Sequence, residues 1–191
     1  MKMLRSSLWA VLLLCPIMRG APLLQLMPAS GALSGLPGST VGWGFTIANT
    51  TNFLAVTGSD FCEGAIVSPC PHTIGTYKDF IGAFNFIVVG PAPESPMVTQ
   101  AFNLAAMTGV GSFQINSTAH AGDVAAGQIL ISYDLFRRSP NDPNFDPTTD
   151  TISTGNRLTA AAKVAVTPEP ASFGMAAVAL LGLAVLKRRL I

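Results

Sequence analysis

The sequence predicts an all-β domain in which two antiparallel sheets pack face to face as a β-sandwich. Three observations favour this fold class. About eight short segments alternate apolar with polar residues at the period of a β-strand. Turn-forming Pro, Gly and Asn residues separate these segments. The middle of the chain shows almost none of the 3.6-residue periodicity of an amphipathic helix.

The clearest predicted strand spans residues 40–49, where one heavy apolar face alternates with small or polar residues. That face consists of Val41, Trp43, Phe45 and Ile47. Residues 49–52, Asn-Thr-Thr-Asn, indicate a hairpin-like connection to a partner strand at residues 53–57. A first strand is predicted at residues 23–27.

The second half of the domain supplies the remaining predicted strands. Residues 80–89 form a mixed aromatic and β-branched run that ends in a Pro-rich turn. Residues 127–136 alternate clearly, and the apolar face consists of Ile129, Ile131, Tyr133 and Leu135. Shorter or weaker patterns predict strands at residues 98–104, 112–116 and 159–167.

One of these segments resembles a known strand. Residues 36–49 contain Pro37-Gly38, then Val41, then Phe45-Thr46-Ile47 and Asn49. The pattern is similar to the Pro-Gly-x-x-Val…Phe-Thr-Ile-x-Asn strand of bacterial surface immunoglobulin-like domains. The resemblance implies an immunoglobulin-like antiparallel β-sandwich. A jelly roll is the alternative architecture.

Charge is sparse in residues 22–167, which we predict to be one domain. This range holds five Lys or Arg and nine Asp or Glu, a net charge of −4, although the 191-residue chain carries +1. A mildly acidic domain without a basic cluster is a poor nucleic-acid binder, so we expect no nucleic-acid partner.

The predicted domain contains two cysteines, Cys62 and Cys70. An even pair in an exported chain predicts a disulfide, and closing so short a loop contributes about 2–3 kcal/mol in the chain-entropy model. A structural zinc site is the alternative. It is disfavoured because two cysteines are too few, and neither His72 nor His120 stands at a finger-like spacing.

The N-terminus has the pattern of a secretory signal peptide. Lys2 and Arg5 precede an apolar stretch that ends near small residues, so we predict that residues 1–21 form the signal. A lipid attached to Cys15 and a retained N-terminal membrane helix are the alternatives.

The C-terminus combines three features in order. They are the motif Pro168-Glu169-Pro170, an uncharged apolar run at residues 171–186, and the basic cluster Lys187, Arg188 and Arg189. The run is somewhat shorter than the ~20 residues that usually cross a bilayer, and flanking cations can snorkel to compensate. The basic cluster should stay cytoplasmic, which places the Pro-Glu-Pro motif outside.

This arrangement of residues 168–191 resembles the PEP-CTERM sorting signal, which a membrane protease of the exosortase family reads. The resemblance implies a Gram-negative-type bacterium that makes exopolysaccharide. It also implies a transmembrane helix at residues 171–186 in the inner membrane during sorting, followed by transfer to the cell surface or extracellular matrix. An exosortase-type protease and exopolysaccharide are the implied partners. A plain C-terminal membrane anchor is the alternative.

The most polar stretch, residues 141–150, contains oxygen ligands of the kind that calcium prefers. These are Asp142, Asn144, Asp146 and Asp150. The spacing begins like an EF-hand loop, but Pro147 stands where that loop needs glycine and Ser153 where it needs a bidentate glutamate. Calcium is therefore a candidate cofactor, and a rigid loop whose side chains bond to the local backbone is the alternative.

Other candidate sites are weaker. Trp43 could offer a sugar platform, but its alternating apolar neighbours favour a place in the core. Asp60, Glu63 and His72 could serve a small glycan hydrolase, yet no nucleophile or metalloprotease motif accompanies them. We therefore expect a non-enzymatic protein of the cell surface or matrix with a structural or adhesive role. A polysaccharide-binding module is the alternative function.

Overall fold

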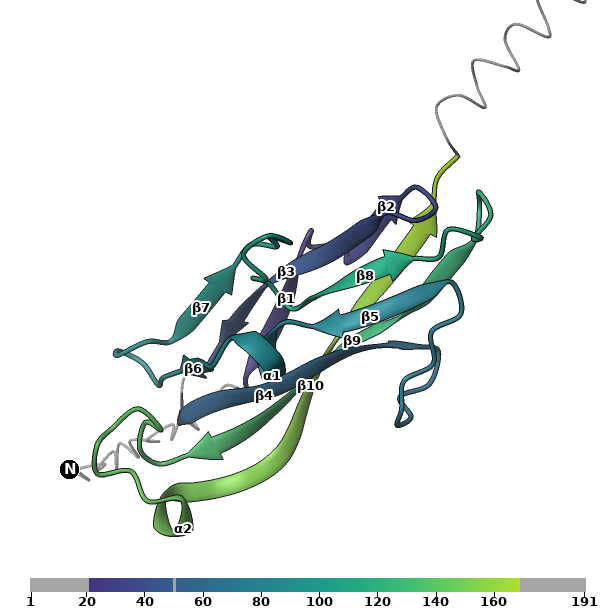
Figure 1. Ribbon diagram of the computed structural model, residues 1–191. Coiled ribbons are helices and arrows are strands. Elements are labelled where there is room, and N and C mark those ends of the chain that lie inside the picture. The colour runs from purple at the N-terminus through teal and green to yellow at the C-terminus, as the bar shows by residue number, and fades with distance from the viewer. Residues whose placement is uncertain (1–20, 50, 169–191) are drawn as a thin grey trace, which may run out of the picture.

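The computed structural model describes residues 21–49 and 51–168, which form two five-stranded sheets packed as a sandwich (Figure 1). The first sheet consists of β1 (Leu23–Met27), β3 (Thr40–Ala48), β8 (Gly111–Ile115), β5 (Gly75–Asp79) and β7 (Met97–Gln100). The second consists of β2 (Ala32–Gly35), β10 (Thr151–Val166), β9 (Val124–Phe136), β4 (Phe53–Glu63) and β6 (Ile87–Val89). Within these ranges no helix has the length and apolar character needed to cross a membrane.

In the first sheet, two strands share one side of β3. β8 pairs with its first half, Val41 opposite Phe113, and β7 pairs with its second half, Ile47 opposite Val98. Residues 101–110 connect β7 to β8, so β7 and β8 lie end to end along one neighbour. β1 occupies the other side of β3 in an antiparallel register.

The second sheet is mixed, which corrects the expectation of purely antiparallel sheets. β2 pairs with the end of β10 in parallel, Ala32 opposite Lys163, while the other pairs of this sheet are antiparallel. The cause lies in the chain path. The short segment from β1 to β2 crosses from the first sheet to the second, so β2 runs beside β10 in the same direction.

The prediction that residues 53–57 form a hairpin with residues 40–49 is wrong. β4 begins at Phe53 as expected, but it pairs with β9 and β6 in the opposite sheet. β3 and β4 each carry a buried apolar face, including Trp43 on β3 and Phe61 on β4, and their rings lie 5.3 Å apart. Packing the two faces against each other across the core buries both, which a flat hairpin would not achieve.

The run at residues 80–89 is not a continuous strand. It forms the short helix α1 (Ile81–Phe84) and then β6. The Asp79 carboxylate accepts the N–H groups of Ile81 and Gly82, at 2.8 and 3.1 Å, and so starts a helical turn. Two strands, β2 and β5, were not predicted, because neither sequence alternates apolar with polar residues.

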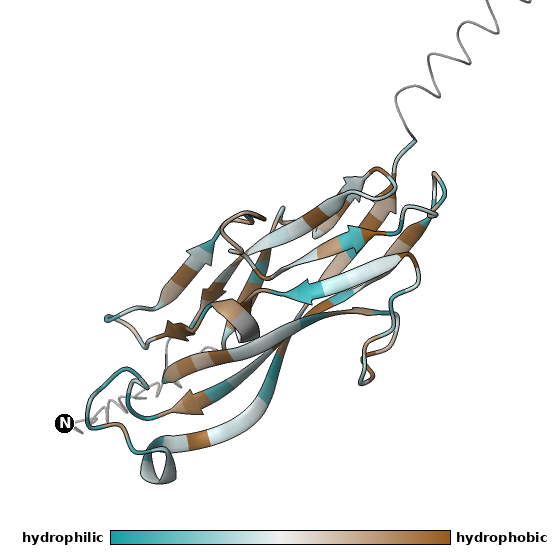
Figure 2. Ribbon diagram, viewed as in Figure 1, coloured by the Kyte–Doolittle hydropathy of each residue, from teal (hydrophilic) through white to brown (hydrophobic). Residues whose placement is uncertain are grey.

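The core lies between the sheets, and Figure 2 shows apolar and polar segments interspersed along the strands of both. Its largest fully buried side chains are Trp43, Phe45, Phe61, Phe80 and Phe113. The Trp43 indole is completely inaccessible, and its Nε1 donates to the carbonyl of Gly31 at 2.8 Å. The interpretation of Trp43 as a core residue is confirmed, and the sugar platform is wrong.

A β-bulge at Thr57 adjusts which side chains of β4 face the core. Val56 pairs with Tyr133, and Gly58 pairs with the next residue, Ser132, so Thr57 is the extra residue. Val56 and Phe61 are both buried although an odd number of positions separates them. Without the bulge, strict alternation would send one of them to the outer face.

Candidate functional site

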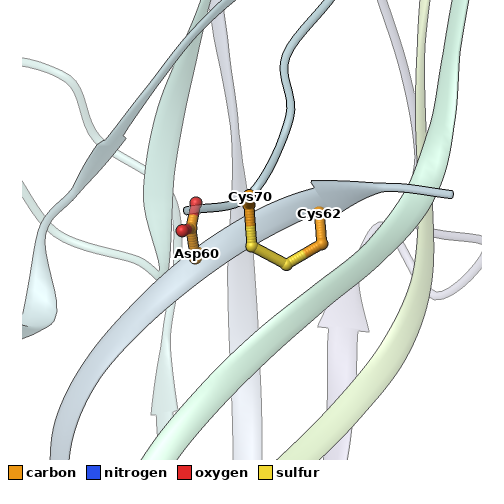
Figure 3. Close-up of side chains that lie close together, drawn as sticks. All are labelled: Asp60, Cys62 and Cys70. Carbon is orange, nitrogen blue, oxygen red and sulfur yellow. A yellow bond between two sulfur atoms is a disulfide. The ribbon is translucent and has the colours of Figure 1, made fainter. Parts of the chain in front are cut away.

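Cys62 and Cys70 form the predicted disulfide, with their Cα atoms 4.6 Å apart (Figure 3). Cys62 lies near the end of β4 and is fully buried. The crosslink folds residues 64–72 back toward the strand they have just left. It therefore holds the residues just after Cys70, including His72, close to β4.

His72 and Asp60 cover the open side of β4. β6 pairs only with Leu54–Val56 of that side. Further along, the Phe61 carbonyl lies 2.7 Å from His72 Nε2, and the Phe61 N–H donates to Asp60 Oδ1 at 2.8 Å. His72 Nε2 is also 3.5 Å from Asp60 Oδ1. These side chains satisfy backbone groups that a neighbouring strand would otherwise pair with.

A polar network joins β4 to the first sheet beside this point. The Ser59 hydroxyl lies 2.6 Å from Asp79 Oδ1, 2.8 Å from the Tyr77 hydroxyl and 2.8 Å from the Val110 carbonyl. Burial raises the pKa of Tyr77 far above its usual range; the hydrogen bond with Ser59 opposes this and the Asp79 carboxylate adds to it. The network thus holds a neutral phenol between strands of the two sheets.

Next to the network the surface is hollowed into a groove of about 330 Å³, which we call the disulfide groove. Its polar lining includes Ser59, Asp60, Asp79, Ser132 and Arg157. The crosslinked loop supplies an apolar wall through Ile66 and Val67, both of which are exposed. Carboxylates, hydroxyls and a guanidinium beside aliphatic carbons suit a ligand with several hydroxyl groups.

A second hollow of about 410 Å³ lies beside α1 and meets the disulfide groove at Thr57. Its lining includes Val56, Ile81 and two exposed aromatic side chains, Phe84 and Phe86. The two hollows share Thr57 and lie next to one another along β4, the first with a mainly apolar lining and the second with a mainly polar one.

In the described ranges, one group of side chains has the spacing of metal ligands, and the disulfide accounts for that spacing. Asp60, Cys62 and Cys70 offer ligand atoms within 4.8 Å of one another (Figure 3). The two sulfur atoms are bonded to each other, so neither is the thiolate that a metal requires. The disulfide and not a metal brings these three residues together.

The candidate hydrolase residues Asp60, Glu63 and His72 lie close together, but each makes a structural hydrogen bond. Glu63 Oε1 accepts the N–H of Thr73 at 2.9 Å, and its other oxygen accepts the Thr73 hydroxyl. The Nε2 of His72 is engaged with a backbone carbonyl. In the described part of the chain no hydrogen bond joins His72 to Ser59, so these two side chains do not form a nucleophile–base pair.

The candidate calcium ligands make local hydrogen bonds. Asp142 Oδ1 accepts the N–H of Asn144 at 2.8 Å. Asp146 caps the one-turn helix α2 (Pro147–Asp150), accepting the N–H of Thr148 at 2.9 Å. The hydrogen bonds from Thr148 lower the pKa of the Asp146 carboxyl.

Asp150 is likewise engaged. Its Oδ2 accepts the N–H of Asp146 at 3.0 Å and lies 3.8 Å from Arg138 Nε. Among the described residues, the carboxylates of this loop do not form a group with metal-ligand spacing. The calcium site therefore stays a prediction, while the locally bonded loop is what the structure shows.

Several predicted features lie outside the described residues. They are the signal peptide up to Gly20, Glu169 and Pro170 of the sorting motif, the apolar run at residues 171–186, and the cluster Lys187, Arg188 and Arg189. Pro168 is described and exposed. The N–H of Thr167, just before it, donates to the carbonyl of Gly35 at 2.8 Å.

Sequence reasoning found part of this region. It identified the disulfide and singled out Asp60 and His72. It missed Ser59, Tyr77 and Asp79, which no motif marks. The sequence marks them only as polar residues within strands, Ser59 close to Cys62 and the other two on β5.

Comparison with protein-family models finds no match, and no curated protein matches the chain. Among solved structures, WR4, an MSP family member of C. elegans, is 8% identical with a TM-score of 0.33, covering 75% of this chain and 97% of that one. A chain from the complex of a CaDoc0917 variant with CaCohA2 is 18% identical with a TM-score of 0.30, covering 77% and 100%. The sixth cohesin of Acetivibrio cellulolyticus scaffoldin B, in complex with a Cel5 dockerin mutant, is 13% identical with a TM-score of 0.26, covering 77% and 99%. Likenesses with scores this low carry no argument about ligands or partners.

Proposed function

We propose that this protein is an exported, immunoglobulin-like β-sandwich that acts by binding at the cell surface or in the extracellular matrix, with a structural or adhesive role. The observation that carries the proposal is the Cys62–Cys70 disulfide. Such crosslinks persist in oxidising compartments outside the cytoplasm. The strand orders β1-β3-β8-β5 and β2-β10-β9-β4-β6 support the immunoglobulin-like arrangement. The proposal assigns no catalytic residue.

Delivery would use the Pro168-Glu169-Pro170 motif, read by an exosortase-type protease at the inner membrane. The position of the motif supports this step. Thr167 makes a backbone hydrogen bond to Gly35 of the domain, and exposed Pro168 follows directly. The first residue of the motif is therefore exposed and lies outside the last strand.

The test is intact mass and C-terminal peptide mapping of the protein from native cells and from culture matrix. We expect a mature chain that ends near Pro168 and lacks Lys187–Arg189. The variant Glu169→Ala should leave the tail in place. The matched control is Glu94→Ala, because Pro93-Glu94 repeats the dipeptide in an exposed loop. A wild-type chain that keeps its tail and stays in the inner membrane would refute the sorting step.

Polysaccharide binding is the second candidate function, and the disulfide groove is the observation that favours it. Sugars present hydroxyl groups along their edges and C–H groups on their faces. The groove pairs Asp60, Ser132 and Arg157 with the aliphatic wall of the crosslinked loop, and the exposed Phe84 and Phe86 lie beyond it.

Titration calorimetry with purified matrix polysaccharide tests this candidate. Arg157→Ala should weaken binding, whereas Lys163→Ala, a cation on the same strand outside the groove lining, should not. The titration should be repeated with calcium and with a chelator. A calcium-dependent rise in melting temperature would support a metal in the loop at residues 141–150. Equal binding by wild type and the Arg157 variant would exclude the disulfide groove as the polysaccharide site.

A further inference from the structure

The disulfide groove and the hollow beside α1 adjoin each other on the surface. We call the second the aromatic hollow, because Phe84 and Phe86 line it. Thr57 lines both hollows. The N–H of Gly82, in the aromatic hollow, also donates to Asp79 Oδ2, in the disulfide groove, at 3.1 Å. The two hollows therefore meet at two places, once on β4 and once at the start of α1.

Glycines keep the junction between the two hollows free of side chains. Gly58 follows the bulge residue Thr57, and a Cβ built on Gly58 would meet only Asp79 Oδ2, at 3.3 Å. A Cβ on Gly82 would lie 2.6 Å from the same oxygen and 2.9 Å from the Thr57 carbonyl oxygen. Because Gly82 has no side chain, α1 lies directly against β4 (Figure 1). Neither glycine carries a side chain that could separate the hollows.

The aromatic hollow presents its rings on a backbone that is held in place. Phe84 is 49% exposed and Phe86 is 66% exposed. Between them, the side-chain amide of Asn85 donates to the carbonyls of Phe80 and Met107, at 3.0 and 2.8 Å. Exposed rings on an anchored backbone form a platform that costs little ordering entropy when a ligand stacks on it.

The disulfide groove supplies polar groups that the domain itself does not use. Both oxygens of Asp79 accept hydrogen bonds, from Ser59 and from the first N–H groups of α1, so this carboxylate belongs to the framework. Within the described ranges, the side chains of Ser132 and Arg157 make no hydrogen bond, and the side chain of Asp60 is 37% exposed. These three side chains offer both donors and acceptors to a bound molecule.

The charges around the two hollows cancel. Asp60, Asp79 and Arg157 line the disulfide groove, and Lys78 Nζ lies 5.1 Å from the centroid of the Phe84 ring. Two cations and two carboxylates sum to zero. A polyanion would meet both carboxylates within a domain whose five basic and nine acidic residues give −4, and a polycation would meet both cations. The site therefore suits an uncharged ligand.

We propose that the two hollows form one cleft for a linear, uncharged glycan chain, in which one sugar ring stacks on Phe86 and a neighbouring sugar bonds through its hydroxyl groups in the disulfide groove. A sugar chain matches both halves, because each unit has an apolar C–H face and an edge of hydroxyl groups that donate and accept hydrogen bonds. An apolar peptide segment would bury Asp60 and Arg157 without polar partners, which is costly. The proposal rests on the polysaccharide binding proposed above and names its ligand class.

Titration calorimetry on the full chain, purified in the disulfide-bonded form from an exporting host, tests the proposal. The probes are disaccharides and hexasaccharides of the cello-, xylo-, manno- and laminari- series, with galacturonan oligomers as the acidic comparison. We expect at least one uncharged series to bind. Its hexasaccharide should bind at least about tenfold more tightly than its disaccharide, because only the longer chain reaches both hollows. The affinity should not change between low and high salt.

Two sets of variants locate the binding. Phe86→Ala should weaken hexasaccharide binding about tenfold, because the stacking ring is lost. Met97→Ala is the matched control, since Met97 is 62% exposed and lines neither hollow. Gly58→Leu fills the junction and should lower the affinity for the hexasaccharide to that for the disaccharide, and Gly58→Ala should lose less. Should the leucine variant fail to fold, Phe86→Ala, at an exposed position, still decides the outcome.

The outcomes separate this proposal from the function on which it rests. Binding that requires Arg157 but depends neither on chain length nor on Phe86 would overturn the shared cleft and leave the disulfide groove as a sugar site. Preference for the galacturonan oligomers, or binding of matrix polysaccharide with none of the uncharged oligosaccharides, would overturn the ligand class alone. If neither the oligosaccharides nor the matrix polysaccharide bind, both proposals fall, and a partner protein becomes the occupant to test.

Discussion

Breaking the Cys62–Cys70 crosslink should lower the free energy of unfolding by about 2.6 kcal/mol at 25 °C. The two cysteines are eight positions apart, so the closed loop contains nine residues. In the chain-entropy model a loop of nine residues corresponds to about 9 cal/mol/K of entropy removed from the unfolded chain. For a domain of this size the loss should appear as a fall of roughly 5–10 °C in melting temperature.

The assay is equilibrium urea unfolding of wild type with and without a reducing agent, because reduction keeps both sulfur atoms in place. Cys62→Ala/Cys70→Ala should lose at least as much stability, since Cys62 is fully buried and its replacement leaves a small void. The reducing agent should not affect that variant. Oxidised and reduced wild type differing by less than about 0.5 kcal/mol would refute the loop-entropy reasoning.

Three further predictions concern the core and its polar network. Trp43→Phe should lower the free energy of unfolding in urea by about 1–3 kcal/mol, because the indole hydrogen bond to Gly31 is lost and a void is left beside it. A loss below about 0.5 kcal/mol would contradict this prediction. Because burial raises the pKa of Tyr77, the unfolded state releases its proton first as pH rises above about 10, so stability should fall there. Tyr77→Phe should reduce that alkaline loss, and an unchanged pH profile would disprove the assignment. Deleting Thr57 should remove the bulge, turn Phe61 out of the core and abolish the near-ultraviolet circular dichroism signal, whereas Thr57→Ala should keep it.

Alternation alone located most strands. The strand at Leu23–Met27 has the predicted bounds, and the strong patterns around Trp43 and Ile131 lie on β3 and β9. Where local chemistry competes with alternation the prediction failed, as at Asp79, whose carboxylate starts a helical turn within an apolar run. β10 begins at Thr151, eight residues earlier than predicted. Residues 151–158 lack strong alternation, so the sequence did not mark them as a strand, but they pair with β9 in the structure.

Only part of the candidate site could be predicted from the sequence. Cysteine count predicted the crosslink, since two cysteines in an exported domain leave one pairing. The disulfide groove could not be predicted. Its lining comes from β4, the loop after it, β5, β9 and β10, and residues as distant as Asp60 and Arg157 meet only after both sheets have formed.

The sequence by itself determined the all-β class, the core position of Trp43, the disulfide and the weakly acidic surface. These depend on composition, on residue spacing and on which side chains avoid water, all of which are local properties. Only the tertiary structure decided that β3 and β4 face each other across the core and that β2 runs parallel to β10. Strand pairing depends on which distant segments bury apolar area together, and local periodicity carries no information about that choice.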